Sequence, residues 1–404
     1  MIVHIDAGAA KGTIKAPPSK SMAHRLLICA AMANGVSHIS GISECEDVSA
    51  TIDCLRALGI IAEKNGDSVT VTGKNISECT PSAPLFCKES GSTLRFFIPI
   101  ALISGKNTIF YGADGLMKRP MSVYKELCER DGLVYIEDGS SIAVKGPLKS
   151  GNYSIIGNIS SQFISGLLFA LPVLGEDSRI KIIPPVESRS YIELTIAALE
   201  AFGVKVIWED DHTLFIKGGQ SYRPCDIEVE GDYSGAAFTE ALNLFGGNVT
   251  VDGLNPASLQ GDKSYKKFYE MLHKGVPTIH IGNCPDLGPV LFAVAAAKHG
   301  GVFTGTKRLK IKESDRAAAM ASELKKFGAS VTVYDDKVVV YPAAFHAPTE
   351  PLRGHNDHRI VMALSVLLSL TGGDIHGAEA VKKSYPNFFA DLKALGIGVK
   401  EYDD

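Results

Sequence analysis

The 404-residue sequence lacks several features that would assign it to a secreted, membrane or disulfide-rich class. Its first residues, MIVHIDAGAAKGTIKAPP, have neither the basic n-region nor the apolar h-region of a signal peptide. Its longest apolar stretches, such as IVMALSVLLSL (360–370), fall short of the roughly 18 residues that a membrane span needs. The eight cysteines form no C-x-x-C pair, and Cys29, Cys54 and Cys128 lie in apolar helical patterns typical of reduced core cysteine. We therefore expect a cytoplasmic protein without a membrane partner.

Motifs for nucleotides and metals are also missing. Neither GxxxxGK followed by Ser or Thr, nor GxGxxG after a strand, occurs in the chain, which excludes the usual nucleotide sites. His355 and His358 lie close to Asp357 but lack a third ligand at suitable spacing, so structural histidines are expected there. The formal net charge of −4 gives no reason to expect a polyanionic partner, so strong anion binding must come from local clusters. We expect no cofactor and no metal.

A repeat of about 70 residues runs through the chain. Four segments consist of a glycine, an alternating apolar strand, a polar turn and a second alternating strand, which is typical of a hairpin: GIIAEKNGDSVTVTG, GLVYIEDGSSIAVKG, GVKVIWEDDHTLFIKG and GASVTVYDDKVVVYP. GVPTIHIG (275–282) and GIGVKEYDD (396–404) are interpreted as shortened versions. The leading glycines, at positions 59, 132, 203, 275, 328 and 396, are 73, 71, 72, 53 and 68 residues apart.

A second series runs in phase with the first. Small or polar residues precede alanine- and leucine-rich helices in SKSMAHRLLICAAM, SGSTLRFFIPIAL, SSQFISGLLFALPVL, DYSGAAFTEALNLF, PDLGPVLFAVAAA and NDHRIVMALSVLLSL. The anchors of these segments are 71, 69, 73, 52 and 71 residues apart, and they are Ser21, Ser92, Ser161, Ser234, Asp286 and Asp357. A more amphipathic helix, such as RPMSVYKELCERDG, precedes the hairpin. The repeat is therefore interpreted as βαβαββ, with the first helix the more apolar.

The repeat predicts an α/β fold of two globular domains. Helices that are apolar nearly all round are buried on all sides, so three repeats can pack their helices inside and their sheets outside. The weakly periodic stretch 220–231 and the APPS segment at 16–19 are the expected crossings between domains. We expect one domain of residues 1–18 plus 230–404, with the N-terminal strand and the last three repeats, and another of residues 19–229.

Cations gather at the predicted helix starts. Serine or aspartate is an ordinary cap there, but Lys or Arg opposes the helix macrodipole by roughly 0.3–1 kcal/mol each. A chain that repeats this unfavourable choice is expected to hold an anion, because helix N-termini with nearby Lys or Arg form phosphate and carboxylate sites. The cations at the apolar helices are Lys20, Arg25, Arg95 and Arg359. Those at the amphipathic helices are Lys118, Arg119, Arg189, Lys312, Arg316, Lys382 and Lys383.

These motifs resemble the enolpyruvyl transferase family, in particular its branch that acts on shikimate 3-phosphate. The matching stretches occur in family order and cover almost the whole chain: PPSKSMAHR, SGSTLRF, KRPM, GNISSQFISGLL, ESRSYIELT, EGDYSGAAF, KESDR, NDHR and KKSYP. The chain departs from the family's Asn-x-Gly-Thr pattern, where it has Glu89 and Ser92 in place of asparagine and threonine. The resemblance implies two domains, each of three βαβαββ units with the helices inside, that close on the substrates.

The resemblance also implies a reaction and its residues. The family's reaction moves the carboxyvinyl group of phosphoenolpyruvate onto the 5-hydroxyl of shikimate 3-phosphate and releases phosphate, a step toward chorismate and the aromatic amino acids. Asp286 matches the general base, which is also expected to hold the hydroxyl, and Glu313 matches the proton donor. Lys20 is a third catalytic candidate. The implied shikimate 3-phosphate ligands are Lys20, Ser21, Arg25, Ser160, Ser161, Gln162, Ser188 and Lys312. The implied phosphoenolpyruvate ligands are Lys20, Gly91, Arg119, Gln162, Arg316, Arg359 and Lys383, and Arg95 beside Gly91 is a further candidate.

Two other functions stay open from the sequence. UDP-N-acetylglucosamine 1-carboxyvinyltransferase shares the family fold and donor but usually has a cysteine in the loop before its Arg-Pro pair, where this chain has GADGLMKRPM. A six-repeat ring around nucleic acid would carry its cations on exposed helix faces, whereas here they gather at helix starts with Asp and Glu among them. We therefore expect two small-molecule partners, no nucleic acid, and a monomer.

Overall fold

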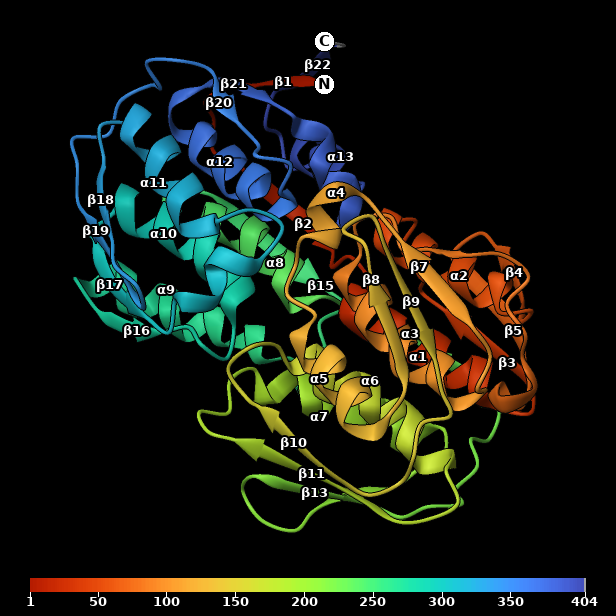
Figure 1. The fold of residues 1–404 in the computed structure, drawn as a ribbon. Helices are drawn as coiled ribbons and strands as arrows, with labels where there is room; N and C mark the ends of the chain where they lie inside the picture. The colour runs from red at the N-terminus through yellow and green to blue at the C-terminus, as the bar shows by residue number, and fades with distance from the viewer. Residues whose placement is uncertain (403–404) are drawn as a thin grey trace. The chain divides into compact units, whose positions relative to one another are not determined.

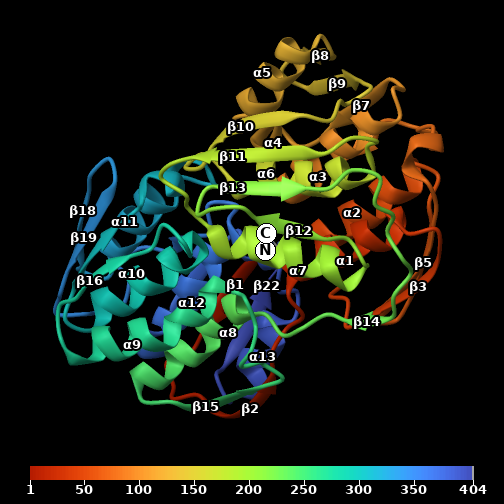
Figure 2. The same ribbon diagram turned by 90° about the horizontal axis from the view of Figure 1, so that it is seen from below.

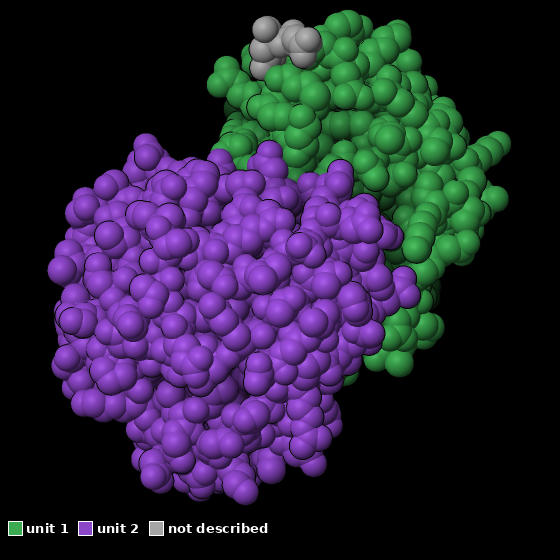
Figure 3. All heavy atoms as spheres, turned by 90° about the vertical axis from the view of Figure 1, so that its right-hand side faces the viewer, with its two compact units in different colours: residues 1–19, 231–404 green, residues 20–230 purple. Residues whose placement is uncertain are grey.

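The structure, a computed structural model, describes residues 1–402, and the chain divides into two compact units. Unit 1 combines residues 1–19 with residues 231–404, and unit 2 consists of residues 20–230 (Figure 3). Each unit has a hydrophobic core of its own. Val3 and Ile5 belong to the core of unit 1 together with residues near the other end of the chain, such as Val399. The first strand therefore packs with the C-terminal half of the chain.

Unit 2 contains three four-stranded sheets that share one pattern. In each sheet the first strand is parallel to the second, and the remaining two strands form an antiparallel hairpin whose later strand pairs with the second. The sheet orders are β14-β3-β5-β4, β6-β7-β9-β8 and β10-β11-β13-β12. The strands are β3 (Gly35–Ser40), β4 (Ile61–Asn65), β5 (Ser68–Gly73), β6 (Leu85–Phe86), β7 (Thr108–Tyr111), β8 (Val134–Glu137), β9 (Ser141–Lys145), β10 (Asn152–Ile156), β11 (Ser178–Ile183), β12 (Val206–Trp208), β13 (Thr213–Ile216) and β14 (Ile227–Glu228). Figure 2 shows β10, β11 and β13 side by side.

The helices of unit 2 form its interior. They are α1 (Lys20–Met32), α2 (Glu46–Ala57), α3 (Gly91–Ile103), α4 (Asp114–Met117), α5 (Ser122–Asp131), α6 (Ser161–Ala170) and α7 (Arg189–Ala201), with the 3-10 turns η1 (Ile76–Glu78) and η2 (Leu171–Val173). Helix α3 is buried at every position from Thr93 to Ile103, and it packs against α6. An apolar helix surrounded in this way can expose only its ends to a ligand, so the helix starts are the places where chemistry is possible.

Unit 1 repeats the sheet pattern with one incomplete member. Its sheet orders are β16-β17-β19-β18, β20-β21-β1-β22 and the two-stranded β15-β2. The strands are β1 (Ile2–Ile5), β2 (Lys11–Lys15), β15 (Asn248–Asp252), β16 (Thr278–His280), β17 (Gly301–Thr304), β18 (Ser330–Val333), β19 (Lys337–Tyr341), β20 (Leu352–Arg353), β21 (Gly373–His376) and β22 (Val399–Tyr402). Strand β1 lies between β21 and β22 and is antiparallel to both. It completes the sheet of the last repeat, although it comes from the start of the chain.

The helices of unit 1 are again inside. They are α8 (Tyr233–Glu240), α9 (Tyr265–Lys274), α10 (Gly288–Ala297), α11 (Arg316–Lys326), α12 (His358–Thr371) and α13 (Phe388–Ala394), with η3 (Ala241–Phe245), η4 (Gly261–Ser264), η5 (Pro285–Leu287), η6 (Lys307–Ile311) and η7 (Ala378–Lys383). Helices α10 and α12 pack against each other and are buried along almost their whole length. Figure 1 shows β17, β18 and β19 on the outer side of α10 and α11. The predicted α/β class with interior helices and exterior sheets is confirmed.

Two local predictions were wrong. The segment 275–282 is not a short hairpin, because it forms the single strand β16, which is parallel to β17 and begins the next sheet. The segment 396–404 likewise supplies one strand within its described part, β22, whose hairpin partner is β1. The stretch 220–231, expected as a crossing between domains, also contains β14, which pairs with β3 and completes the first sheet of unit 2. For β22 and β14 the pairing strand is distant in the sequence, and local periodicity does not reveal such a partner.

No helix within residues 1–402 is both long and apolar enough to cross a membrane.

The position of β1 generates a stability prediction. Ile5 is fully buried in the central strand of its sheet, so Ile5→Ala should lower the free energy of unfolding by about 2–5 kcal/mol through lost burial and a residual cavity. Ile61→Ala in β4 is the control, because Ile61 is 56 % exposed, and a loss below about 0.5 kcal/mol is expected. Urea unfolding followed by circular dichroism measures both. Equal losses would contradict the central placement of β1.

Candidate active site

Helix α1 begins at Lys20, which follows Pro17, Pro18 and Ser19, and the two prolines cannot continue an upstream helix. The Lys20 ammonium lies 2.7 Å from the Asp47 carboxylate at the first turn of α2, and both side chains are largely buried. Arg25 is 2 % exposed and donates to the Ser21 carbonyl at 2.6 Å, to the Tyr191 carbonyl at 3.0 Å and to Thr195 Oγ1 at 2.8 Å. Burial lowers the pKa of Arg25 to about 10, so it stays charged at neutral pH. Both cations are held rigidly beside the helix start.

A second group of unit 2 surrounds Gly91, the first residue of α3. Arg95 Nη1 donates to Gln162 Oε1 at 2.7 Å, which joins the start of α3 to the start of α6. A Cβ on Gly91 would lie 2.9 Å from Arg119 Nη1 and 3.4 Å from Arg95 Nη1, so a side chain there would displace the Arg119 guanidinium group from its place beside the backbone. No residue within 1–402 accepts a hydrogen bond from the buried Nε of Arg119. This nitrogen is available to an external acceptor.

Serines mark the remaining helix starts of unit 2. Ser160 accepts a hydrogen bond from the Gln162 amide at 3.3 Å and caps α6, and Ser161 is the buried first residue of that helix. Ser188 precedes α7 and has a φ of +56°, a left-handed conformation that is uncommon for serine. Such a backbone conformation costs free energy and persists only where the surrounding structure holds it. Residues held in this way are common at functional sites.

In unit 1, Asp286 lies within η5 and is surrounded by cations. Its carboxylate is 2.7 Å from Arg316 Nη1, 3.3 Å from Lys312 Nζ and 3.7 Å from Arg359 Nη2. Burial by itself raises the pKa of Asp286, but these three positive charges outweigh it and hold that pKa well below its usual range. Burial has the opposite effect on Lys312, because it lowers the pKa of this lysine to about 8 despite the neighbouring carboxylate.

Arg359, in the first turn of α12, is the cation that the protein itself satisfies least. It is 3 % exposed, and no residue of the described chain accepts a hydrogen bond from its Nε or Nη1. Its guanidinium group instead lies over the Phe238 ring, 5.5 Å from the centroid. A buried donor without an acceptor costs about 1–3 kcal/mol, and more when it is charged. Arg359 is therefore a strong candidate to bind an anion.

Four consecutive side chains before and at the start of α12 each bind a different part of unit 1. His355 Nε2 lies 2.8 Å from Glu323 Oε1 of α11, and the Asn356 side chain accepts from Lys383 at 2.8 Å. Asp357 accepts from Arg316 Nε at 2.9 Å, and His358 Nδ1 lies 2.9 Å from Glu313 Oε2. This segment connects Glu313, Arg316 and Lys383, three of the residues that the sequence singled out.

The same segment corrects one detail of the sequence analysis. A third ligand-type group does lie beside His358, because Glu313, Asp357 and His358 bring one ligand atom each within 4.8 Å of one another. Arg316, however, donates to both oxygens of Asp357, at 2.9 and 3.3 Å, and a metal ion would have to displace this buried cation. The donor set therefore fits an ion-pair network better than a metal site.

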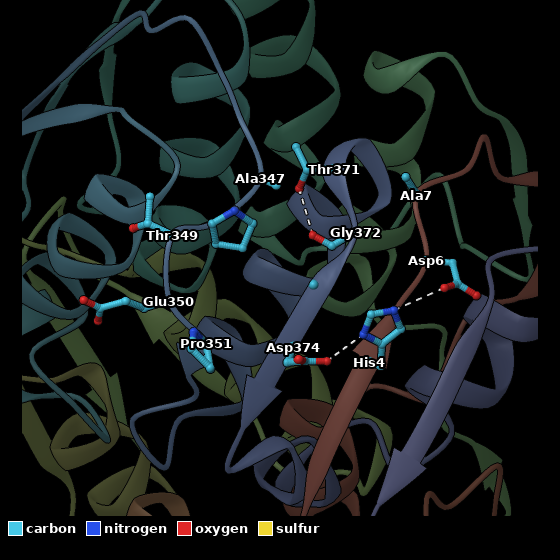
Figure 4. Close-up of a pocket in the computed structure, with 12 residues that line it drawn as sticks. His4, Asp6, Ala7, Ala347, Thr349, Glu350, Pro351, Thr371, Gly372 and Asp374 are labelled. Atoms are coloured by element: carbon cyan, nitrogen blue, oxygen red, sulfur yellow. Dashed lines mark hydrogen bonds and ion pairs between the residues drawn. The ribbon is translucent and has the colours of Figure 1, made fainter.

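A polar pocket of about 480 Å³ lies elsewhere in unit 1 (Figure 4). The His4 ring points toward two carboxylates there, 3.2 Å from Asp6 and 2.6 Å from Asp374. None of the residues that the sequence predicted for the site is among those that line this pocket. The pocket is separate from the candidate site.

The structure thus gathers the predicted residues into two clusters, one in each unit. The unit 2 cluster contains ten residues at helix starts or in the loops before them: Lys20, Ser21, Arg25, Gly91, Arg95, Arg119, Ser160, Ser161, Gln162 and Ser188. The unit 1 cluster contains Asp286, Lys312, Glu313, Arg316, Arg359 and Lys383.

Several residues of these clusters were missed from the sequence. Asp47 and Asp357 are the acidic partners of Lys20 and Arg316, and Asp262 is buried near Asp286. Burial, followed by the charge of Asp286, raises the pKa of Asp262 to about 7. The pairing of cations at helix starts required buried carboxylates somewhere, but spacing along the chain could not identify which ones.

Comparison with known proteins decides the family. The family model described as EPSP synthase (3-phosphoshikimate 1-carboxyvinyltransferase) matches residues 6–392. The 3-phosphoshikimate 1-carboxyvinyltransferase of Clostridium kluyveri is 38 % identical, over 99 % of this chain and 98 % of the relative. That of Clostridium perfringens is 39 % identical, over 96 % of both chains. The chain belongs to the EPSP synthase family. The resemblance inferred from the motifs is confirmed.

Solved structures agree with this at the level of the fold. The EPSP synthase of Acinetobacter baumannii superposes with a TM-score of 0.81 at 23 % identity, and the match covers 100 % of both chains. The enolpyruvyl transferase NikO of Streptomyces tendae matches with a TM-score of 0.74 at 14 % identity, over 99 % of this chain and 98 % of that one. The architecture of this EPSP synthase family member is thus retained where little sequence identity remains.

The buried pair between Asp357 and Arg316 generates a prediction for this family member. Asp357→Asn removes the charge opposite a 2 % exposed guanidinium, so the free energy of unfolding should fall by about 3–5 kcal/mol at pH 7. Burial raises the pKa of Asp357, but Arg316 outweighs it and lowers that pKa overall, so the pair stabilises the fold above the ordinary carboxyl pKa. This contribution is lost as the pH falls through the lowered value, so the difference between wild type and variant should shrink in acid.

Asp335→Asn is the matched control, because Asp335 is 71 % exposed and pairs with Lys310 at 3.0 Å. Its effect should be much smaller than that of Asp357→Asn, because solvent screens an exposed pair. Chemical unfolding at pH 7 and at about pH 2, well below the ordinary carboxyl pKa of about 3.9, measures both variants. A loss for Asp357→Asn that does not depend on pH would point to lost packing rather than to the ion pair.

Proposed function

We propose that the chain transfers the carboxyvinyl group of phosphoenolpyruvate to the 5-hydroxyl of shikimate 3-phosphate and releases phosphate. Membership of the EPSP synthase family supports this reaction. The observation that carries it is the set of buried guanidinium nitrogens without an acceptor, at Arg119 in unit 2 and at Arg359 in unit 1. The two substrates carry two phosphates and two carboxylates, which are the anions that such donors bind best.

We assign shikimate 3-phosphate mainly to the unit 2 cluster. Lys20 and Arg25 supply two fixed charges at the start of α1, and the serine hydroxyls at the starts of α1, α6 and α7 supply neutral hydrogen bonds for hydroxyl and phosphate oxygens. The ligands proposed are Lys20, Ser21, Arg25, Ser160, Ser161, Gln162 and Ser188, with Lys312 from unit 1. Because the cations are held by protein acceptors before the ligand arrives, little side-chain entropy is lost on binding.

We assign phosphoenolpyruvate to guanidinium and ammonium groups of both clusters. Arg119 and Arg95 lie within contact distance of a Cβ placed on Gly91, so an anion at that point meets two cations and an open backbone. Arg316, Arg359 and Lys383 supply the unit 1 donors, and Lys20 and Gln162 complete the set. Such a concentration of positive charge offsets the desolvation and mutual repulsion of the anions.

The proposed chemistry is an addition followed by an elimination. The 5-hydroxyl oxygen attacks C2 of phosphoenolpyruvate while Asp286 accepts the hydroxyl proton and Glu313 delivers a proton to the methylene carbon. The tetrahedral adduct then loses a proton from the new methyl group and expels inorganic phosphate, which restores the double bond. His358 holds Glu313 at 2.9 Å and thereby fixes the direction in which the acid points.

The depressed pKa of Asp286 fits this role once the substrates are considered. In the free protein three cations keep the carboxylate ionised and weakly basic. When substrate anions bind to the same cations, these cations stabilise the Asp286 carboxylate less, and the pKa of Asp286 rises. The base is therefore strengthened only when both reactants are in place.

The nucleic-acid alternative is disfavoured by burial. Arg25, Arg95, Arg316 and Arg359 are each at most 6 % exposed, so they cannot line a surface for a polyanion. The cytoplasmic location and the monomeric state stay predictions.

A phosphate-release assay tests the proposed function directly. Phosphate should appear with phosphoenolpyruvate and shikimate 3-phosphate together, and with neither alone. Release with UDP-N-acetylglucosamine as the acceptor would transfer the assignment to the sister reaction. Release with neither acceptor would reject both.

Mutations should distinguish the roles of the two carboxyl groups, Asp286 as the base and Glu313 as the acid. Asp286→Asn and Glu313→Gln keep the side-chain shapes but remove the base and the acid, so each should lower kcat by about 100-fold or more. For Glu313→Gln the substrate Kd should change little, since the acid acts in the transition state. Steady-state turnover and binding titrations measure these effects. Turnover close to wild type in either variant would remove that residue from its role.

Lys312 should give the reaction an alkaline limit. Burial favours its neutral amine and lowers its pKa to about 8, so the charge is present below that pH and lost above it. We expect kcat/KM for shikimate 3-phosphate to fall as the pH rises through about 8. Lys312→Arg keeps the charge and should move the fall to higher pH.

Lys310→Arg is the control, because Lys310 is 40 % exposed and pairs with Asp335 outside the cluster. It should leave the pH profile of wild type in place. If Lys312→Arg also leaves the alkaline fall where it was, a different group titrates there.

A further inference from the structure

The turn before α12 contains two adjacent non-glycine residues in the left-handed region. His355 has a φ of +50° and Asn356 a φ of +52°. Left-handed backbone costs roughly 1–2 kcal/mol for an ordinary residue and is easiest for Gly, Asn and Asp. Two such residues in succession persist only where the surroundings hold them.

Side-chain contacts hold this turn at both residues. His355 bonds to Glu323, which is 1 % exposed and also accepts from Lys326 Nζ at 2.8 Å and from the Arg353 amide at 3.0 Å. His355 therefore ties the turn to the buried end of α11. Asn356 makes a different contact, to Lys383 at the end of η7.

Asn356 binds the Lys383 ammonium twice. Lys383 Nζ donates to the backbone carbonyl of Asn356 at 2.6 Å and to its side-chain oxygen at 2.8 Å. A lysine side chain has four rotatable carbon–carbon bonds and three equivalent N–H donors, so it does not fix the direction of its own charge. Two acceptors on one residue fix two of the three N–H directions, and tetrahedral geometry then fixes the third.

We propose that Asn356 is the positioning residue for Lys383, and that its left-handed turn serves to present two oxygens of one residue to that ammonium. This inference deepens the proposed function, since it rests on Lys383 as a phosphoenolpyruvate ligand. Three residue types suit the backbone at this position. Glycine lacks the side-chain acceptor, and aspartate would neutralise the charge that an anionic substrate needs. Asparagine supplies the acceptor and leaves Lys383 cationic.

The placement of the turn adds to this role. The next two residues, Asp357 and His358, bond to Arg316 and Glu313. The turn therefore fixes the position of the proposed substrate-binding Lys383 relative to Arg316 and to Glu313, the proposed acid. In this proposal Asn356 acts on the substrate through Lys383.

Asn356→Gly tests the inference because glycine prefers the observed backbone conformation. The variant relieves the left-handed backbone but removes one acceptor from the buried Lys383 ammonium, so the two effects on stability oppose each other and the melting temperature should change little. The KM for phosphoenolpyruvate should rise about tenfold through loss of one charge-assisted hydrogen bond, with the KM for shikimate 3-phosphate within about twofold. A merely structural role would instead lower the melting temperature and change both KM values alike.

Two further variants separate the possible failures. His355→Gly relieves the neighbouring left-handed residue without touching Lys383, and its KM for phosphoenolpyruvate should rise less than that of Asn356→Gly. Lys383→Gln tests the ligand itself and should raise the same KM. If Lys383→Gln has no effect, the assignment of Lys383 under the proposed function fails and the inference fails with it. If Lys383→Gln raises this KM but Asn356→Gly does not, the inference alone is overturned.

Discussion

The burial of positive charge is the constraint on which the rest of this structure depends. Arg316 is 2 % exposed and lies between two carboxylates, Asp286 and Asp357. A lone buried charge would be too costly to keep, so each cation of the site requires a partner that is buried with it. The partners come from separate elements, and the need to bring them together fixes η5, α11 and α12 relative to one another. Arg359 shares Asp286 at 3.7 Å through Nη2, but its buried Nε and Nη1 have no acceptor among the described residues.

The inside-out arrangement explains why the charges lie where they do. Apolar helices occupy the interior of each unit, so polar groups can be reached only at their ends. Helix N-termini carry unpaired N–H groups and a partial positive charge, and the added Lys and Arg side chains strengthen the attraction for anions. The proposed function makes use of this repulsion, which is unfavourable in isolation, because the same positive charges would attract the substrate anions. Repetition of one supersecondary unit multiplies the number of such starts.

Periodicity was sufficient to predict most of the fold from the sequence. The glycine-led hairpins and the apolar helices gave the βαβαββ unit and the α/β class. The N-terminal strand was expected to belong with the last three repeats, but its pairing with β22 and the pairing of β14 with β3 were not predicted, because pairing between remote segments leaves no local pattern. The cations of the candidate site could be predicted from the sequence because Lys and Arg are electrostatically unfavourable near a helix N-terminus. Asp47, Asp262 and Asn356 could not be predicted, because a buried acceptor looks like any other polar residue until the fold shows which donor it contacts.

The most informative of these hidden acceptors is Asn356, because its position obeys two requirements at once. The backbone at φ +52° restricts the choice to very few residue types, and the Lys383 ammonium requires an uncharged acceptor. Only their combination selects asparagine over glycine, which the backbone alone would favour. A related argument applies to Gly91, where a side chain would have to displace the Arg119 guanidinium group. At both positions a neighbouring cation restricts the residue type, so the identity of the residue depends on a charge that another segment of the chain supplies.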